Sequence, residues 1–131
     1  DYNGAISDYN KAIELDPEIA LAYNNRGLSK NNLKDYNGAI SDYNKAIELD
    51  PDFSSAYVSR GLSKYYLEDY YGSISDFSKA IELDPDYTGA YVNRGLSKEL
   101  INDLNGACAD WKKAANMGHT NSVKWVANQC N

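Results

Sequence analysis

The sequence contains very few residues of the kinds that build metal sites or catalytic centres. Among 131 residues there are one histidine and two cysteines. Cys108 and Cys130 are too far apart in the chain to form the closely spaced pair of a zinc site. His119 follows Gly118 near the expected end of a helix, which favours a turn residue over a ligand or a catalytic base. We therefore expect no metal and no cofactor.

Basic residues are also scarce, and long apolar runs are absent. The 13 Lys and Arg residues are outnumbered by 19 Asp and Glu residues, giving a net charge of −6. A nucleic-acid partner would require a basic stripe, so none is expected. No apolar run approaches the roughly 20 residues of a membrane span, so no membrane partner is expected either. The chain starts at Asp1 without a signal sequence, which indicates a fragment of a longer protein and leaves the compartment unknown, cytoplasmic by default.

Motifs that would indicate an enzyme are missing as well. The sequence has no phosphate-binding loop and no nucleophile motif. Ser29, Ser63 and Ser97 recur without a neighbouring histidine, and many of the carboxylates recur in copies of E-L-D-P. Catalytic acids are rarely repeated in this way, so we expect a solvated acidic face and no enzymatic activity.

Repetition is what the sequence has in abundance. The stretch "DYNGAISDYNKAIELDP" at 1–17 returns unchanged at 35–51, then as "DYYGSISDFSKAIELDP" at 69–85 and "DLNGACADWKKAANMGH" at 103–119. The segments between these copies also repeat, as "AYNNRGLSK", "AYVSRGLSK" and "AYVNRGLSK". The copies start at 1, 35, 69 and 103, a period of 34 residues. A period of this size indicates stacked structural repeats.

Each half of the unit has the pattern of a helix. Within 36–49 the apolar residues recur at spacings of three and four, which is the helical period. A hairpin at Asn37-Gly38 is the alternative, but the flanking residues do not alternate. We expect a helix at 2–15, antiparallel pairs within 20–49, 54–83 and 88–117, and a closing helix near 120–130.

Local residues explain where the second helix of each unit begins and where it ends. Asp35, Asp69 and Asp103 can cap its start by accepting hydrogen bonds from free backbone amides. Pro17, Pro51 and Pro85 end it, because proline lacks the amide hydrogen and forces the preceding residue out of helical geometry.

The unit resembles the tetratricopeptide repeat, which also has 34 residues. The signature residues are Tyr23, Gly27, Ala39, Tyr43, Ala46 and Pro51, then Tyr57, Gly61, Ser73, Phe77, Ala80 and Pro85, then Tyr91, Gly95, Ala107, Trp111 and Ala114. The resemblance covers essentially the whole chain. It departs from the family at His119, which replaces proline, at Arg26, Arg60 and Arg94, which replace leucine, and at Lys30, Lys64 and Lys98, which replace an aromatic residue.

The resemblance implies an all-α fold: a right-handed superhelical solenoid of antiparallel helix pairs with a C-terminal capping helix. It implies a single domain, 1–131. Within it, 1–19 is the second helix of a truncated repeat, 20–53, 54–87 and 88–119 are full repeats, and 120–131 is the capping helix.

The resemblance also implies that the first helix of each of the pairs within 20–49, 54–83 and 88–117 lines a concave groove. This groove would hold a protein or an extended peptide. The candidate partner-binding residues are Asn24, Asn25, Asn31, Asn32, Val58, Ser59, Tyr65, Tyr66, Val92, Asn93 and Glu99, with Leu28, Ser55, Leu62, Gly89 and Leu96 beside them. The copies differ most at these positions, which fits a groove and also fits unconstrained drift. Family members that hold a terminal carboxylate use Lys, Arg and Asn at matching positions. Here Asn24, Leu28, Ser59, Gly89 and Asn93 stand there, with no Lys or Arg among them. A neutral to polar peptide is therefore expected.

The expected function is a protein–protein interaction module, a scaffold or adaptor. The alternative is an accessory domain that docks substrates for a larger enzyme or assembly machine. Weak self-association is also expected, because no helix precedes 2–15 to cover Ala5, Ile6, Tyr9 and Ile13.

Three packing contacts are predicted. Gly27, Gly61 and Gly95 should allow two helices to approach closely, with Ala39 and Ala46 as the small partners. The adjacent space should be filled by the aromatic residues Tyr23, Tyr57, Tyr91, Tyr43, Phe77 and Trp111. Arg26, Arg60 and Arg94 should pair with the aspartate column Asp8, Asp42, Asp76 and Asp110, unless their head groups reach solvent. Counting outward from a turn near 118–119 places Cys108 opposite Cys130. The pair forms either a disulfide, which implies an extracytoplasmic protein, or two thiols in contact. A small buried apolar residue is the alternative for Cys108, because earlier copies have isoleucine there.

Overall fold

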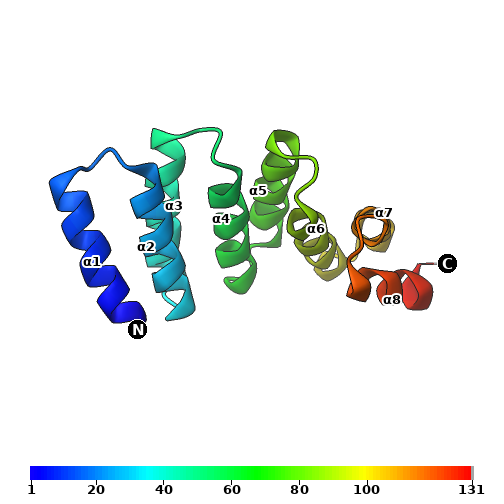
Figure 1. The fold of residues 1–131 in the computed structure, drawn as a ribbon. Helices are drawn as coiled ribbons and strands as arrows, with labels where there is room; N and C mark the ends of the chain where they lie inside the picture. The colour runs from blue at the N-terminus through cyan, green and yellow to red at the C-terminus, as the bar shows by residue number, and fades with distance from the viewer. Residues whose placement is uncertain (131) are drawn as a thin grey trace.

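Eight helices account for most of the chain in the computed structural model, which describes residues 1–130 (Figure 1). They are α1 (Tyr2–Leu15), α2 (Ala20–Asn32), α3 (Tyr36–Leu49), α4 (Ser54–Tyr66), α5 (Tyr70–Leu83), α6 (Thr88–Leu100), α7 (Leu104–Asn116) and α8 (Thr120–Gln129). No strand occurs among the described residues. None of these eight helices has the length and apolar character needed to cross a bilayer. The predicted helices are confirmed, and the last residue of the predicted 120–131 segment lies outside the described residues.

The predicted caps are present at the helix ends. Asp35 Oδ1 accepts a hydrogen bond from the amide of Gly38 at 3.0 Å, and Asp69 and Asp103 repeat the contact one and two units later. At the other end, the backbone amide of Asp50 bonds to the carbonyl of Ala46 while its extended backbone leads the chain into Pro51. Local sequence therefore sets both ends of each second helix.

The helices are arranged as a solenoid of antiparallel pairs. Figure 1 shows them in chain order along a single row, with α1 at one end and α8 at the other. Each helix packs against its neighbours in sequence, and the first helices also meet, α2 with α4 and α4 with α6. The second helix of one pair therefore lies between two first helices, which buries it on two sides.

A large ring fills the centre of each pair. Tyr43, Phe77 and Trp111 are fully buried, and each ring lies against the glycine of the facing first helix. A Cβ atom built on Gly27 would lie 2.7 Å from the Tyr43 ring, and one on Gly61 would lie 2.8 Å from Phe77. These rings, which were predicted to fill the adjacent space, are therefore the direct partners of the glycines, whereas the prediction of Ala39 and Ala46 as those partners was wrong. The ring occupies the space that the missing Cβ leaves open.

Helix α1 packs against α2, whereas the equivalent helix α3 packs against both α2 and α4. One side of α1 therefore stays exposed. The two helices have the same sequence, yet α1 has no buried residue, whereas α3 buries Ala39, Tyr43 and Ala46. Ala5, Ile6, Tyr9 and Ile13 are only half-buried, as expected for a partly open apolar face. Self-association through this face stays a prediction.

Candidate binding surface and the charge ladder

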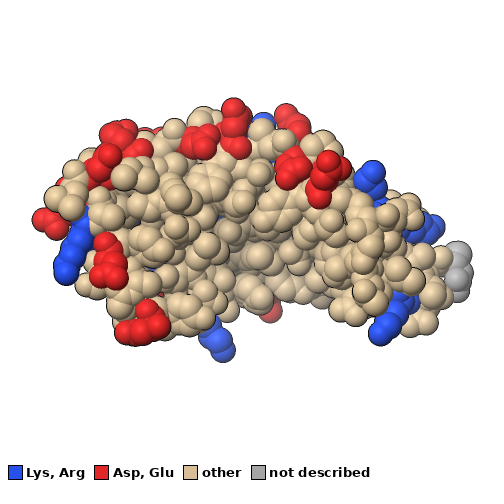
Figure 2. Space-filling view, viewed as in Figure 1, with Lys and Arg blue, Asp and Glu red and all other residues tan. Residues whose placement is uncertain are grey.

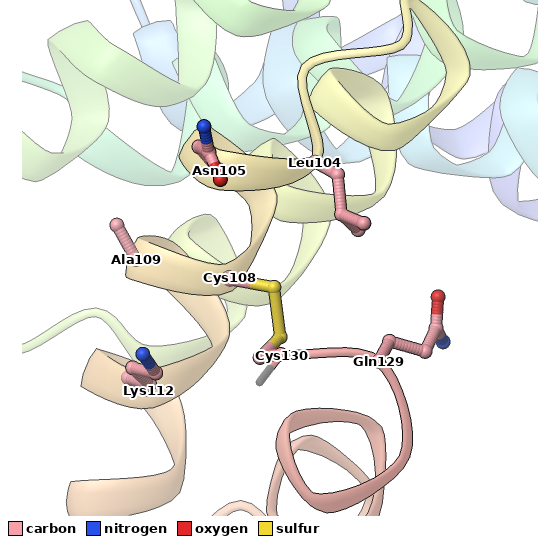
Figure 3. Close-up of a pocket in the computed structure, with 7 residues that line it drawn as sticks. All are labelled: Leu104, Asn105, Cys108, Ala109, Lys112, Gln129 and Cys130. Atoms are coloured by element: carbon pink, nitrogen blue, oxygen red, sulfur yellow. A yellow bond between two sulfur atoms is a disulfide. The ribbon is translucent and has the colours of Figure 1, made fainter.

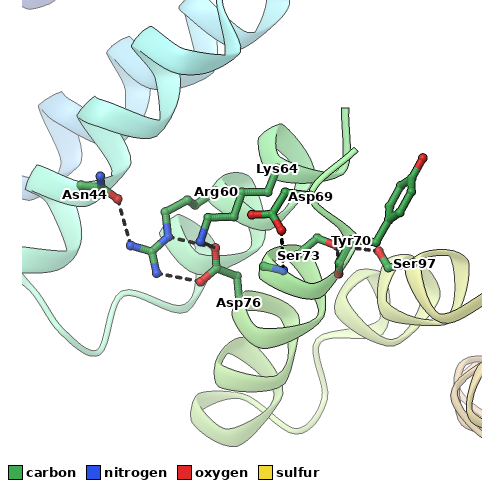
Figure 4. A network of polar contacts seen from close by, with 9 residues as sticks. Asn44, Arg60, Lys64, Asp69, Tyr70, Ser73, Asp76 and Ser97 are labelled. Atoms are coloured by element: carbon green, nitrogen blue, oxygen red, sulfur yellow. Dashed lines mark hydrogen bonds and ion pairs between the residues drawn. The ribbon is translucent and has the colours of Figure 1, made fainter. Parts of the chain in front are cut away.

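The predicted arginine–aspartate pairs are confirmed, and each aspartate binds two cations. Arg26 donates from Nε and Nη2 to the two carboxylate oxygens of Asp42, at 2.9 and 2.6 Å. Lys30 Nζ lies 2.9 Å from the same carboxylate. The arrangement recurs as Arg60 and Lys64 on Asp76 (Figure 4), and as Arg94 and Lys98 on Asp110. We call these three clusters the charge ladder.

A third contact ties each arginine to the preceding repeat. Arg26 Nη1 donates to Asn10 on α1 at 2.9 Å, Arg60 Nη1 to Asn44 on α3 at 3.0 Å, and Arg94 Nη1 to Ser78 on α5 at 3.2 Å. Each guanidinium therefore joins three helices. The hydrogen bond to Asp42 raises the pKa of Arg26, so the arginine keeps its charge throughout the physiological range.

The lysines of the ladder were missed at the sequence level. Lys30 follows Arg26 by four residues, so both side chains leave the same face of α2. That spacing, repeated at Lys64 and Lys98, was the available signal. It also explains why a cation stands where the family has an aromatic residue: the buried Asp42 carboxylate, whose side chain is only 5% exposed, gains a second counter-ion.

The charge ladder leaves the exposed surface of the first helices α2, α4 and α6 nearly uncharged. Every Lys and Arg of α2, α4 and α6 is bound to a buried aspartate, so none projects freely. Figure 2 shows the middle of one side of the molecule almost free of charge, with acidic side chains along the edge where the turns between pairs lie. A partner at this uncharged area would meet polar and apolar groups.

The structure buries three of the predicted groove residues. Asn24, Val58 and Val92 are only 4%, 6% and 8% exposed. Val58 packs in one cluster with Ala90 of the next first helix. These three residues therefore leave little surface for a partner, and their role in partner binding stays a prediction.

The other predicted residues keep part of their surface. Asn25, Asn31, Ser55, Ser59, Leu62, Tyr65, Gly89, Asn93, Leu96 and Glu99 are half-buried, and Leu28, Asn32 and Tyr66 are exposed. We call these the first-helix surface. Two of its amides already have partners: Asn31 Oδ1 accepts from Ser63 Oγ at 2.8 Å, and Asn32 Nδ2 donates to the Leu28 carbonyl at 3.0 Å.

The recurring serines have structural roles. Ser63 binds Asn31 of the preceding repeat, and Ser97 shares a hydrogen bond of 2.8 Å with Ser73 (Figure 4). Ser63 and Ser97 are fully buried. These hydroxyls therefore connect adjacent repeats.

Four tyrosines form a cluster at one end of the first-helix surface. Tyr66 stacks on Tyr36 with ring centroids 5.1 Å apart, and Tyr65 meets Tyr66 and Tyr70 edge-on at 5.7 and 5.6 Å. Burial, followed by the neighbouring Tyr70, raises the pKa of Tyr65, so its hydroxyl stays neutral. Tyr66 remains 53% exposed. Tyr36 and Tyr70 were missed from the sequence, although each directly follows a capping aspartate and so begins a second helix beside the end of a first helix.

The C-terminal helix is held at both ends. His119 Nδ1 accepts from the amide of Ser122 at 3.2 Å and so caps α8, which confirms a turn residue. At the far end, Cys108 and Cys130 form a disulfide with Cα atoms 5.6 Å apart, so the predicted proximity is confirmed. Among residues 1–130, no group of three or more potential metal ligands gathers.

The burial of the Asn24 side chain can be tested by substitution. Its Oδ1 is buried without a hydrogen-bond partner in the described part of the chain, and the same place in the next two repeats holds Val58 and Val92. Replacing Asn24 with Val should stabilise the protein by about 1–2 kcal/mol, because a buried unsatisfied amide is removed. Chemical denaturation followed by circular dichroism measures the change. A loss of stability would show that the amide has a partner in solution.

Comparison with known proteins agrees with this geometry. Models described as tetratricopeptide repeat match residues 20–53 and 54–87, and a model described as TPR repeat matches residues 1–33. The chain belongs to the tetratricopeptide repeat family. The solved structures that it resembles include "Crystal structure of MamA", with a TM-score of 0.86 and 24% identity over 90% of this chain and 69% of that one.

A second solved structure is similar in fold. "First TPR of Spaghetti (RPAP3) bound to HSP90 peptide SRMEEVD" has a TM-score of 0.80 and 22% identity over 83% of this chain and 88% of that one. These likenesses establish the tetratricopeptide fold, a right-handed superhelical solenoid. Comparison with curated protein sequences gave no match.

Proposed function

We propose that this tetratricopeptide repeat chain is a protein–protein interaction module that holds an extended, uncharged peptide segment on its first-helix surface. The tyrosine cluster supports this proposal. A large ring such as Tyr66, 53% exposed and stacked on a neighbour, presents a rigid apolar face that loses little conformational entropy when it is covered. Side-chain amides such as Asn25 and Asn93 lie along the same surface and can bond to a peptide backbone.

The charge ladder supports a peptide without acidic side chains. The RPAP3 domain was solved with the peptide SRMEEVD, which is rich in carboxylates. Binding such a peptide requires cations directed at the ligand. Here the cations of the first helices are bound to Asp42, Asp76 and Asp110, and Glu99 adds a negative charge to the surface. An acidic tail is therefore disfavoured, and a neutral segment is favoured.

Selection from a random peptide library on the immobilised protein tests the proposal. Enriched peptides should carry few Asp and Glu residues, and Tyr66→Ala should weaken their binding by about 1–4 kcal/mol, the range of interface hot spots. Tyr71→Ala is the matched control, because Tyr71 is 73% exposed and lies outside the tyrosine cluster. Tyr66→Ala should also lower the free energy of unfolding by about 1–2 kcal/mol, because its contacts with Tyr36 and Tyr65 are lost.

Two results would contradict the proposal. One is enrichment of acidic C-terminal tails, or binding of SRMEEVD itself, because that would require free cations. The other is equal loss of affinity in Tyr66→Ala and Tyr71→Ala, because that would remove the special role of the tyrosine cluster.

A further inference from the structure

A small cavity opens beside the disulfide that joins α7 to the end of α8. Its volume is about 300 Å³, and its lining includes both cysteines together with Leu104, Lys112 and Gln129 (Figure 3). The disulfide therefore forms part of a cavity wall and is not sealed inside the core.

We propose that this cavity is a thiol–disulfide exchange site, in which a low-molecular-weight thiol attacks the Cys108–Cys130 disulfide. The two sulfurs are placed differently. Cys130 follows the last turn of α8 and is half-buried, whereas Cys108 is only 8% exposed within α7. An incoming thiolate therefore reaches Cys130 first.

Lys112 assists the departure of Cys108. It follows Cys108 by four residues, which places it one turn along the same face of α7, and it lines the same cavity. A nearby ammonium group stabilises a thiolate, and a more stable leaving thiolate departs faster. Cys108 is thus the leaving group and Cys130 the site of the mixed disulfide.

The exchange is balanced by two molecules of thiol. The first thiolate bonds to Cys130 Sγ while the bond between the two protein sulfurs breaks, and Cys108 leaves as a thiolate. The second thiolate attacks the mixed disulfide, releases Cys130 as a thiolate, and leaves as the oxidised dimer of the small thiol. Two electrons pass from the small thiols to the protein, and the two protons that the thiols gave up end on the cysteines.

Exchange would release the end of α8 from α7. Ser122 is the only buried residue of α8. An aromatic contact joins this helix to α7, where the rings of Trp125 and Trp111 have centroids 5.2 Å apart. Once the disulfide opens, the far end of α8 loses its covalent link to α7. The fully buried Trp111 then becomes more accessible to water. Both tryptophans of the chain lie in this contact, so their fluorescence reports on it.

The test uses the oxidised protein, verified by a mass that is two hydrogens below that of the dithiol form. Reduced glutathione is added without denaturant, samples are quenched with an alkylating reagent, and the rate is read by mass spectrometry. Lys112→Gln should slow the reaction severalfold, since a leaving thiolate without a nearby positive charge is less stable and departs more slowly. Lys113→Gln is the matched control, because Lys113 is exposed and does not line the cavity.

Supporting results are the slower rate in Lys112→Gln alone, a first glutathione adduct on Cys130, and a red shift of tryptophan emission on reduction. The proposal is overturned if glutathione reacts only after denaturation, if the two lysine variants react at equal rates, or if the first adduct lies on Cys108. It is also overturned if the protein retains two free thiols after treatment with an oxidant.

Discussion

Replacing Asp42 with Ala should lower the free energy of unfolding by about 3–5 kcal/mol, whereas the same change at Asp8 should cost less than about 0.5 kcal/mol. Asp42 is 5% exposed at its side chain and binds Arg26 and Lys30, so its removal leaves two cations without their partner. Asp8 lies in an identical stretch of sequence but is exposed, and no ion pair joins it to another residue within 1–130.

Urea denaturation of the two variants followed by circular dichroism measures this difference. Because the local sequences of 1–17 and 35–51 are the same, helix propensity and capping cancel in the comparison. Equal losses at the two positions would show that the charge ladder contributes nothing beyond the local effect of the aspartate.

The second large effect is expected at Tyr43. Replacing this fully buried ring with Ala should cost about 3–5 kcal/mol, because a cavity opens between α2 and α3. Tyr9 has the same sequence neighbours but is only half-buried, so Tyr9→Ala should cost about 1–2 kcal/mol. Thermal and urea unfolding of both variants provides the comparison.

Tyr43→Phe is the control that keeps the ring. The Tyr43 hydroxyl makes no hydrogen bond of good geometry among residues 1–130, although the Ser59 and Ser63 side chains lie beside it, and Phe77 occupies the same place in the next repeat. This variant should be as stable as the parent or more so, because the unsatisfied hydroxyl is removed. A large loss in Tyr43→Phe would mean that the hydroxyl bonds to a neighbour in solution, and the cost of Tyr43→Ala would then not measure ring packing.

The sequence was sufficient for the helices because their limits are local. Asp35 supplies the acceptor for a free amide, and Pro51 removes a donor, wherever the rest of the chain lies. The arginine–aspartate pairs were also predictable, because the two columns recur with the period of the repeat. Counting residues outward from one turn placed Cys108 opposite Cys130.

Contacts that depend on how the helices pack against one another were not predictable from the sequence. The helical pattern placed both small residues and the Tyr43 ring near Gly27 but did not decide which of them makes the direct contact, and that contact is the ring. How closely successive first helices pack decides how much surface Val58 offers to a partner, and a helical pattern does not contain that spacing. Tyr36 meets Tyr66 for a related reason: the two residues are 30 positions apart, and only stacking of the repeats brings their rings together.

Because α1 and α3 have the same sequence, the number of repeats in this solenoid can change easily during evolution. Removing 18–51 would join Pro17 directly to Asp52, and the helix beside α4 would keep the sequence that it has now. The shortened chain would contain no junction that the present one lacks. Misaligned recombination between stretches that encode the same residues produces such losses and gains of whole units. The extent of the surface offered to a partner can therefore evolve in steps of one repeat, without selection for any new contact.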